Sequence, residues 1–368
     1  MNQPQHTAKK PTAQEWLVQE RSFLSVVALC FVLAAVSAPY AGLAMWVGFF
    51  FAAYSTVAND SIQTIGTFIA SNRERPWWAL WLWIGGIFVL TVGYSWLNFD
   101  GGAIVGDVSY DRLQAKGFEK TPTEFHFLQV AAPLFLVIMT RLKMPVSTTF
   151  LILSSFAASG KSIAAVTIKS VSGYGLAFVC AVLVWGIAGP WMKKRFQGEA
   201  HPAWVAMQWL SSGALWSVWL MQDAANIAVY LPRSLNTLQF AGFTLTVLLG
   251  LGVLFRMGGE RIQEVVEEKS HVVDVRAATV INVLFAFILY YFKIKSNIPM
   301  STTWVFIGLL GGRELVMALR NAGEEGRTTK QAMWIVVRDL GVVTLGFLVS
   351  LLIAGAINPT VGKALLGG

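Results

Sequence analysis

The sequence contains very little charge. Charged residues make up 13% of its 368 residues and hydrophobic residues 55%, whereas soluble domains carry about 25% charged residues. The gaps between charges are long: no Asp, Glu, Lys or Arg occurs at 22–59, 76–99, 170–192, 200–222, 234–255 or 340–362. An apolar stretch of about 18 residues or more can cross a bilayer as a helix. The sequence therefore predicts an all-α, polytopic transmembrane protein.

Other absences exclude whole functional classes. The two cysteines, Cys30 and Cys180, lie in apolar runs without a CxxC pair, which excludes thiolate metal sites and a disulfide framework. No histidine pair has helical spacing, which argues against a bis-histidine haem, and no Gly-rich phosphate loop follows a strand pattern. We therefore predict neither an enzyme nor an ATP-driven pump, and no cofactor beyond a coupling ion. The net charge of +8 indicates basic cytoplasmic loops rather than a nucleic-acid partner, so membrane lipids are the expected surroundings.

We predict eleven membrane-spanning segments and a cytoplasmic N-terminus, because this orientation puts most Lys and Arg on the inner side. The expected location is the plasma (inner) membrane. The predicted spans are 22–38, 40–71, 77–97, 124–141, 145–160, 173–192, 203–232, 236–257, 272–292, 299–318 and 339–357. The predicted organisation is a cytoplasmic tail at 1–21, an extra transmembrane helix at 22–38, a first repeat at 40–192, a basic linker at 193–202, a second repeat at 203–357 and a C-terminal tail at 358–368.

The division into repeats comes from two signatures that each occur twice. Asn59-Asp60 with Gln63 corresponds to Gln222-Asp223 with Asn226, and the Pro-x-Ser-Thr-Thr segment at 145–149 corresponds to that at 299–303. Each half has five spans, an odd number, so the second half enters the membrane from the opposite side. Inverted repeats of this kind place a transporter's substrate site near the bilayer midplane, often between broken helices.

The two aspartates are the best candidates for binding a cation. Asp60 and Asp223 lie deep in apolar sequence, where a charge costs at least ~3 kcal/mol without a partner or water. Each has an amide three residues later, on the same helix face, and neither signature contains a basic residue. Carboxylate and amide oxygens suit sodium, and a proton on the aspartate is the alternative. The competing interpretation is a buried Asp that holds helices together. The predicted cation-binding residues are Asn59, Asp60, Gln63, Gln222, Asp223 and Asn226, with sodium at Asp60 and Asp223.

The Pro-x-Ser-Thr-Thr segments indicate an anion site. Proline favours the first position of a helix, where hydroxyls lie beside free backbone N–H groups and the positive end of the helix dipole. This combination suits phosphate or sulfate. The competing interpretation is N-capping or close helix packing. The predicted substrate-binding residues are Ser147, Thr148, Thr149, Ser301, Thr302 and Thr303.

We do not predict a role in this site for the isolated charged residues near the spans. Arg313 and Glu314 are interpreted as a local ion pair, with a gate as the alternative. Lys161 and Lys169 are interpreted as surface lysines, with attraction of anions at the outer mouth as the alternative.

At these signatures the sequence resembles the inorganic phosphate transporter (Pit-type) family of symporters, over about residues 40–357. The matching residues are Ala58-Asn59-Asp60 with Gln63, Gly66-Thr67, Asp223 with Asn226, and the segments at 145–149 and 299–303. The resemblance implies sodium- or proton-driven symport of inorganic phosphate or a similar tetrahedral oxyanion, with the Asp and amide residues handling the cation and the hydroxyls contacting the anion. It also implies a homodimer.

The sequence departs from the family pattern at several positions. Gln63 and Gln222 replace the usual Asn, while Phe150 and Trp304 stand where the family often has His. The sequence therefore predicts a divergent member. Phosphate symport is the first hypothesis, a sulfate or other oxyanion permease the second, and a non-transporting membrane sensor or scaffold the third. Phosphate is favoured over sulfate because its protonated oxygens can donate hydrogen bonds to the aspartates.

Overall fold

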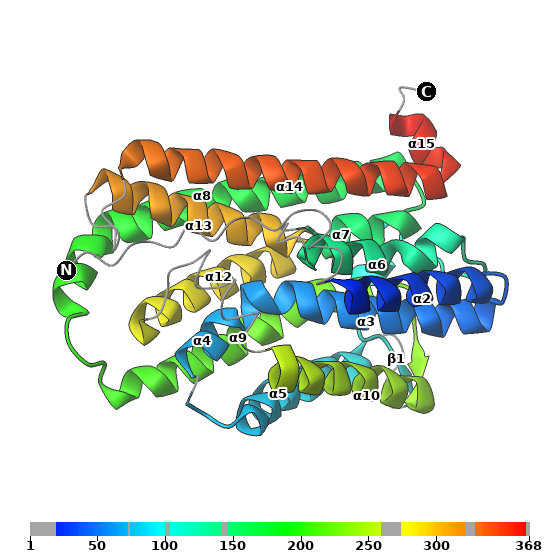
Figure 1. The fold of residues 1–368 in the computed structure, drawn as a ribbon, viewed down its shortest axis with the longest axis horizontal. Helices are drawn as coiled ribbons and strands as arrows, with labels where there is room; N and C mark the ends of the chain where they lie inside the picture. Colours follow the sequence, from blue (N-terminus) through cyan, green and yellow to red (C-terminus); the bar gives the residue numbers. More distant parts are fainter. Residues whose placement is uncertain are drawn as a thin grey trace.

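The chain forms a bundle of long helices that run along one common direction (Figure 1). The computed structural model describes residues 20–72, 74–99, 104–141, 146–258, 274–320 and 328–365. Among them, seven helices are long and apolar enough to cross a membrane, and two shorter apolar helices accompany them. The expectation of an all-α, multi-pass membrane protein is confirmed.

The elements follow one another in two halves. The first contains α2 (Arg21–Ser37), α3 (Ala41–Thr64), α4 (Gly66–Ser71), α5 (Trp77–Asn98), β1 (Val105–Gly106), η1 (Arg112–Gln114), α6 (Phe127–Arg141), α7 (Thr148–Leu151), η2 (Leu153–Phe156) and α8 (Gly160–Arg195). The second contains α9 (Pro202–Ala228), β2 (Leu235–Asn236), α10 (Thr237–Val253), the π-helix η3 (Leu254–Gly258), α12 (Val275–Lys295), α13 (Thr302–Leu319), α14 (Thr329–Ile357) and α15 (Pro359–Leu365).

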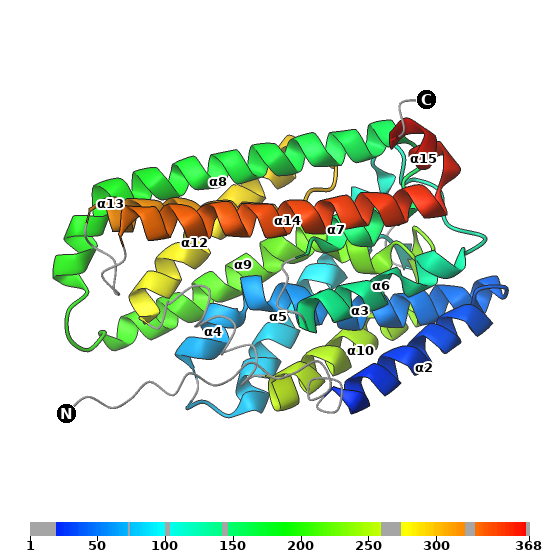
Figure 2. The same cartoon turned by 45° about the horizontal axis from the view of Figure 1, so that its top comes forward.

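Equivalent helices of the two halves make equivalent contacts. Helix α3 packs on α6 as α9 packs on α12. The long helix α8, which ends the first half, packs on α13 of the second, and α14, which ends the second half, packs on α7 and η2 of the first. Figures 1 and 2 show α8, α13 and α14 along the same side of the bundle. Each half therefore supports the hydroxyl-bearing segment of the other.

The connecting segments gather at two ends of the bundle. At one end, which we call the outer end after the predicted orientation, β1 pairs antiparallel with β2, and Ala158 N–H donates to the Gly117 carbonyl. Between the start of α2 and the end of α6, the Arg141 guanidinium binds Glu20 through two hydrogen bonds of 2.8 and 2.9 Å. Loops predicted to share a side of the membrane thus lie together, as an alternating course of spans requires.

One predicted span is wrong. Residues 145–160 were expected to cross the membrane as one helix, but the described part of this segment forms only the short helices α7 and η2. The Ser154 hydroxyl donates to the Thr149 carbonyl and the Ser155 hydroxyl to the Ile152 carbonyl. Such side-chain bonds compete with helical backbone bonding and interrupt the helix. The equivalent helix α13 lacks serines after its first turn and continues for 18 residues.

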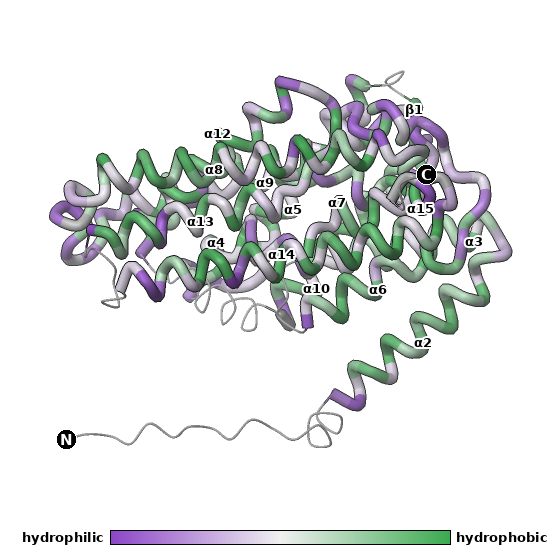
Figure 3. The backbone as a smooth tube through the Cα atoms, turned by 90° about the horizontal axis from the view of Figure 1, so that it is seen from above, coloured by the Kyte–Doolittle hydropathy of each residue, from purple (hydrophilic) through white to green (hydrophobic). Residues whose placement is uncertain are grey.

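The ends of the predicted regions also shift. Helix α8 extends to Arg195, into the predicted linker at 193–202, and α15 occupies much of the predicted C-terminal tail at 358–368. Residues 1–19 of the predicted N-terminal tail and Pro145 lie outside the described residues. The extra helix α2 contacts α6 and α3 and leans away from the rest of the bundle with an apolar surface (Figure 3).

The contact between α8 and α13 depends on glycine. A Cβ atom added to Gly308 would lie 2.4 Å from the Tyr174 carbonyl oxygen, and one added to Gly312 would lie 2.4 Å from the Phe178 carbonyl oxygen. Two glycines four residues apart let helix backbones approach closely inside a membrane. Because Ser301 precedes α13 directly, this packing also fixes the second hydroxyl segment.

Candidate functional site

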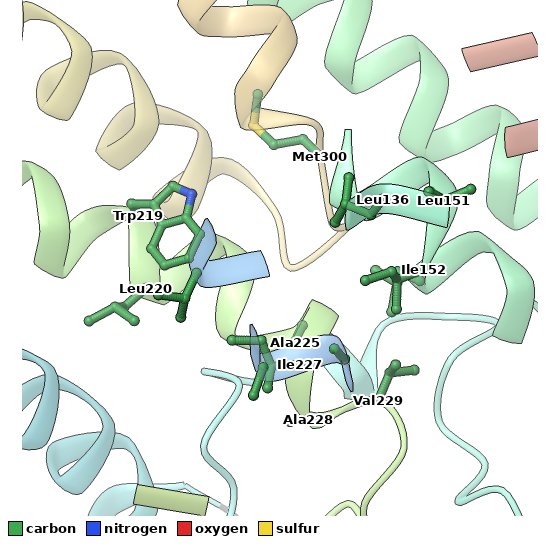
Figure 4. Packing of buried hydrophobic residues seen from close by; sticks show 14 of the residues in the cluster. Leu136, Leu151, Ile152, Trp219, Leu220, Ala225, Ile227, Ala228, Val229 and Met300 are labelled. Atoms are coloured by element: carbon green, nitrogen blue, oxygen red, sulfur yellow. The ribbon is translucent and has the colours of Figure 1, made fainter. Parts of the chain in front are cut away.

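The two aspartates and the hydroxyl segments meet inside the bundle, although they come from four separate parts of the chain. Helices α3 and α9 carry Asp60 and Asp223, while α7 and the start of α13 bring the threonines. Buried apolar side chains lie on the same and neighbouring elements, and Figure 4 labels Leu136, Leu151, Ile152, Trp219, Leu220 and Met300 among them. The repeated signatures therefore form one site, in the interior between the two halves.

Asp60 is fully buried (0% exposed) and is satisfied by neutral donors. Its Oδ1 accepts hydrogen bonds from the amide nitrogens of Asn59, at 2.6 Å, and Gln63, at 3.3 Å. Its Oδ2 accepts a bond of 3.1 Å from the Thr148 hydroxyl. Both carboxylate oxygens thus have partners, but none of these donors carries a positive charge.

Asp223 is equally buried (0% exposed) and is only half satisfied. Its Oδ1 accepts from Asn226, at 2.7 Å, and lies 3.3 Å from the Thr149 hydroxyl. Its Oδ2 has no hydrogen-bond partner among the described residues. Asp60 lies close enough to Asp223 for the two carboxylates to repel each other. A bound cation or proton between them would relieve this repulsion.

The two halves exchange hydrogen bonds across the site. Gln63 of the first half donates to Thr303 of the second at 3.1 Å. In return, Asn226 of the second half donates to the hydroxyls of Thr148 and Thr149 of the first, at 2.9 and 3.2 Å. The residues predicted to bind a cation and those predicted to bind an anion are therefore in direct contact.

Three further buried oxygens of the site have no hydrogen-bond donor among the described residues. They are Oε1 of Gln63, Oε1 of Gln222 and Oδ1 of Asn226, in addition to Oδ2 of Asp223. A buried polar atom without a partner costs about 1–3 kcal/mol. All four atoms belong to residues predicted to bind the cation, and all are hard oxygen ligands. Gln222 also ties α9 to α12, because its amide nitrogen donates to the Leu289 carbonyl at 2.8 Å.

The serines of the two hydroxyl segments cap helices. Ser147 Oγ accepts from the Phe150 backbone N–H at 3.3 Å, and Ser301 Oγ accepts from the Trp304 backbone N–H at 3.4 Å. The threonines that follow face the aspartates, with Thr302 next to the Asp223 carboxyl. Among the hydroxyls, the threonines are thus placed closest to the charged groups. The aromatic rings of Phe150 and Trp304 instead pack on each other and on Phe347.

Sequence reasoning missed two contributors. Thr140, an ordinary hydroxyl in an apolar helix, donates to Asn59 at 2.9 Å and so orients the amide beside Asp60. Arg112, from the outer loop, donates from Nε to the Met221 carbonyl at 3.2 Å and attracts the nearby Asp223 carboxylate. Neither signature contains a basic residue, so this basic neighbour of Asp223 was not predicted. No local signal could have found it, because Arg112 approaches only through folding of the loop.

Of the other charged residues interpreted from the sequence, the Arg313–Glu314 pair and Lys161 agree with expectation and Lys169 does not. Arg313 and Glu314 form the predicted local ion pair, with Nη1 of the arginine 2.7 Å from Oε1 of the glutamate. Lys161 is exposed, as expected of a surface lysine. Lys169 is buried (9% exposed), so its interpretation as a surface lysine is wrong.

Comparison with known proteins finds a similar fold but no similar sequence. No family model and no curated protein sequence matches the chain. The structure does match a solved structure of "The sodium-dependent phosphate transporter" with a TM-score of 0.58 and 15% identity, covering 92% of this chain and 99% of the other. The chain therefore has the fold of that solved structure. The agreement extends over nearly the whole of both chains.

Proposed function

We propose that the protein is a secondary active transporter that carries inorganic phosphate together with sodium. Asp60 and Asp223, with their neighbouring amides, handle the cation, and the threonines of the two hydroxyl segments contact the anion. The fold shared with a sodium-dependent phosphate transporter supports this assignment. So does the position of the site between inverted repeats, where secondary transporters bind their substrates.

The observation that carries the proposal is the set of four buried oxygens without donors, on Gln63, Gln222, Asp223 and Asn226. A site that only held helices together would satisfy its buried acceptors internally. Oxygens left free, next to two carboxylates that repel each other, favour a cation. The cation would also reduce the repulsion between the carboxylates and an incoming anion, so the two ligands are expected to bind cooperatively.

The open Oδ2 of Asp223 also bears on the substrate. A singly or doubly protonated phosphate carries hydroxyl groups that can donate to this oxygen. Sulfate at neutral pH carries no proton and cannot make such a bond. This difference favours phosphate over sulfate as the transported anion.

Uptake by purified protein in liposomes tests the proposal. Radiolabelled phosphate should accumulate when an inward sodium gradient is imposed, and excess unlabelled sulfate should compete poorly. Asp60→Asn and Asp223→Asn should each abolish gradient-driven uptake. Asp339→Asn is the matched control, because the Asp339 side chain is partly exposed (40%) and forms an ion pair with its neighbour Arg338, away from the site.

Three outcomes contradict parts of the proposal. Uptake that ignores both sodium and pH gradients rules out coupling. Uptake that follows the pH gradient alone assigns the aspartates to protons. Full transport by the double Asp60→Asn, Asp223→Asn variant rules out the site itself.

A further inference from the structure

Two buried basic side chains converge on the same backbone at the outer end of the site. Arg112 (0% exposed) and Lys169 (9% exposed) both donate to the carbonyl oxygens of Ser296 and Ile298. These carbonyls lie between the end of α12 and Ser301, which caps α13. The arginine comes from the outer loop of the first half and the lysine from α8, so separate elements bring two like charges together.

The outer loop is built so that it delivers Arg112 to this position. The two preceding residues, Tyr110 and Asp111, have positive φ angles of 55° and 60°, which residues other than glycine adopt rarely and at some cost. The buried Asp107 carboxylate holds the turn by accepting bonds from the backbone N–H groups of Ser109, at 2.9 Å, and Asp111, at 2.8 Å. The strained backbone at Tyr110 and Asp111 therefore directs the Arg112 guanidinium into the bundle.

The positive charge of Arg112 is not balanced by an ion pair. Among the described residues, no carboxylate lies within salt-bridge distance of Arg112 or Lys169, and Nη2 of Arg112 is buried without any hydrogen-bond partner. Carbonyl oxygens carry only partial charge, so they cannot neutralise the buried guanidinium of Arg112. Burial lowers the pKa of Arg112 to about 10, and attraction to Asp223 opposes this shift. Arg112 therefore stays charged at neutral pH.

The other charged groups nearby are already paired or deeper in the protein. Lys293 lies over the Tyr110 ring and is attracted by Asp107 and Asp111 of the loop. Asp223 attracts Arg112 from the inner side but faces the cation-binding amides with its Oδ1. The unused donor capacity at the outer end thus belongs to Arg112 and Lys169.

We propose that Arg112 and Lys169 form a binding site for a free inorganic oxyanion at the outer end of the central site. Resting on the proposed function, this site would hold the transported phosphate above Asp223 before it reaches the threonines. A phosphate there would accept a charge-assisted hydrogen bond from the free Nη2 of Arg112 and another from the ammonium of Lys169. It would also compensate the buried charge of Arg112 and favour the protonated form of Lys169 beside it.

Binding measured by thermal unfolding tests this site without requiring transport. Purified protein in a neutral, lipid-free detergent is titrated with sodium phosphate against sodium chloride at equal sodium concentration and ionic strength. Wild type should be stabilised by phosphate, and Lys169→Gln should raise the phosphate concentration needed by about tenfold or more, as expected for loss of a charged hydrogen bond. Lys161→Gln is the matched control, because it removes an exposed lysine from the same end of the same helix.

Two further variants separate binding from scaffolding. Lys169→Arg keeps the positive charge and should restore most of the phosphate response. Arg112→Lys keeps the charge but loses the planar guanidinium, and should weaken phosphate binding while the sodium-dependent stabilisation is retained. Equal phosphate affinity in wild type, Lys169→Gln and Arg112→Lys would overturn the proposal. So would a loss in Lys169→Gln that Lys169→Arg does not rescue.

A parallel titration with phospholipid distinguishes a lipid headgroup from free inorganic phosphate as the ligand of this site. If phosphatidylglycerol gives the Lys169-dependent stabilisation and inorganic phosphate does not, the pair binds a lipid headgroup and the proposal is wrong. Failure here is distinguishable from failure of the proposed function. Phosphate binding that depends on Lys169, in a protein that does not transport phosphate, would contradict the proposed function and support the proposed site. Transport by Lys169→Gln with an unchanged KM would contradict the proposed site and support the proposed function.

Discussion

The unequal surroundings of the two aspartates lead to a specific prediction for Asp223→Asn. Asp223 Oδ2 accepts no hydrogen bond from the described residues, and the nearby Thr302 hydroxyl can accept a bond from the new amide nitrogen, while Oδ1 keeps its bonds from Asn226 and Thr149. The substitution removes the charge and little of the hydrogen bonding. We therefore expect Asp223→Asn to fold normally and to lose its response to sodium.

The magnitude follows from the contacts. The bonds to Oδ1 change from a charged acceptor, worth about 1.5–3 kcal/mol each, to a neutral one, worth about 0.5–1.5 kcal/mol. Relief of repulsion from Asp60 offsets part of this loss, so the sodium-free stability should change by no more than about 2 kcal/mol. In wild type, sodium at a hundred times its dissociation constant adds roughly 2.7 kcal/mol. That increment should be absent from Asp223→Asn.

The assay compares unfolding midpoints in sodium chloride and choline chloride at equal ionic strength. Wild type and the control Asp339→Asn should unfold at a higher temperature in sodium. Asp223→Asn should give the same midpoint in both salts, near the wild-type value in choline. A sodium-dependent rise that persists in Asp223→Asn would refute the assignment of its free oxygen to the cation. Asp60→Asn should be less stable than Asp223→Asn, because three donors point at the Asp60 carboxylate and its new amide would face some of them.

Three other substitutions test the supporting structure. Gly312→Ala should lower the unfolding midpoint, because the new methyl group meets the Phe178 carbonyl at 2.4 Å, whereas Gly86→Ala, with open space around it, should not; equal midpoints would contradict the close packing of α8 and α13. Thr149→Val should cost about 1–3 kcal/mol by leaving buried partners unsatisfied and should weaken phosphate-driven stabilisation, and wild-type values for both quantities would exclude a role for this hydroxyl. Ser301→Ala should cost about 1 kcal/mol as a lost N-cap and raise the apparent KM for phosphate; lower stability with an unchanged KM would assign the serine to capping alone.

The repeated signatures made the centre of the site predictable from the sequence. A charged residue deep in apolar sequence needs a partner. Because the signatures around Asp60 and Asp223 match, their partners are expected at one interface between the repeats. Asp60, Gln63, Asp223, Asn226 and the threonines are indeed in contact.

The parts that escaped prediction depend on tertiary structure or on local competition. Arg112 reaches Met221 only because a strained loop folds back onto the bundle. Lys169 looks like a surface lysine until α12 and the following segment cover it. The break within 145–160 arises because serine hydroxyls bind their own backbone, which the average hydrophobicity of the segment does not reveal.

If the protein works as the proposed transporter, the hydrogen bonds exchanged between the repeats affect the timing of its transport cycle. If the repeats move past one another, the bonds from Gln63 to Thr303 and from Asn226 to Thr148 must break each time the unloaded carrier returns. At roughly 0.5–1.5 kcal/mol each, two such bonds slow that return about five- to hundredfold. A bound anion would take over these hydroxyls and spare the loaded carrier this delay. Exchange of labelled for unlabelled phosphate, which needs no empty return, should therefore run faster than net uptake.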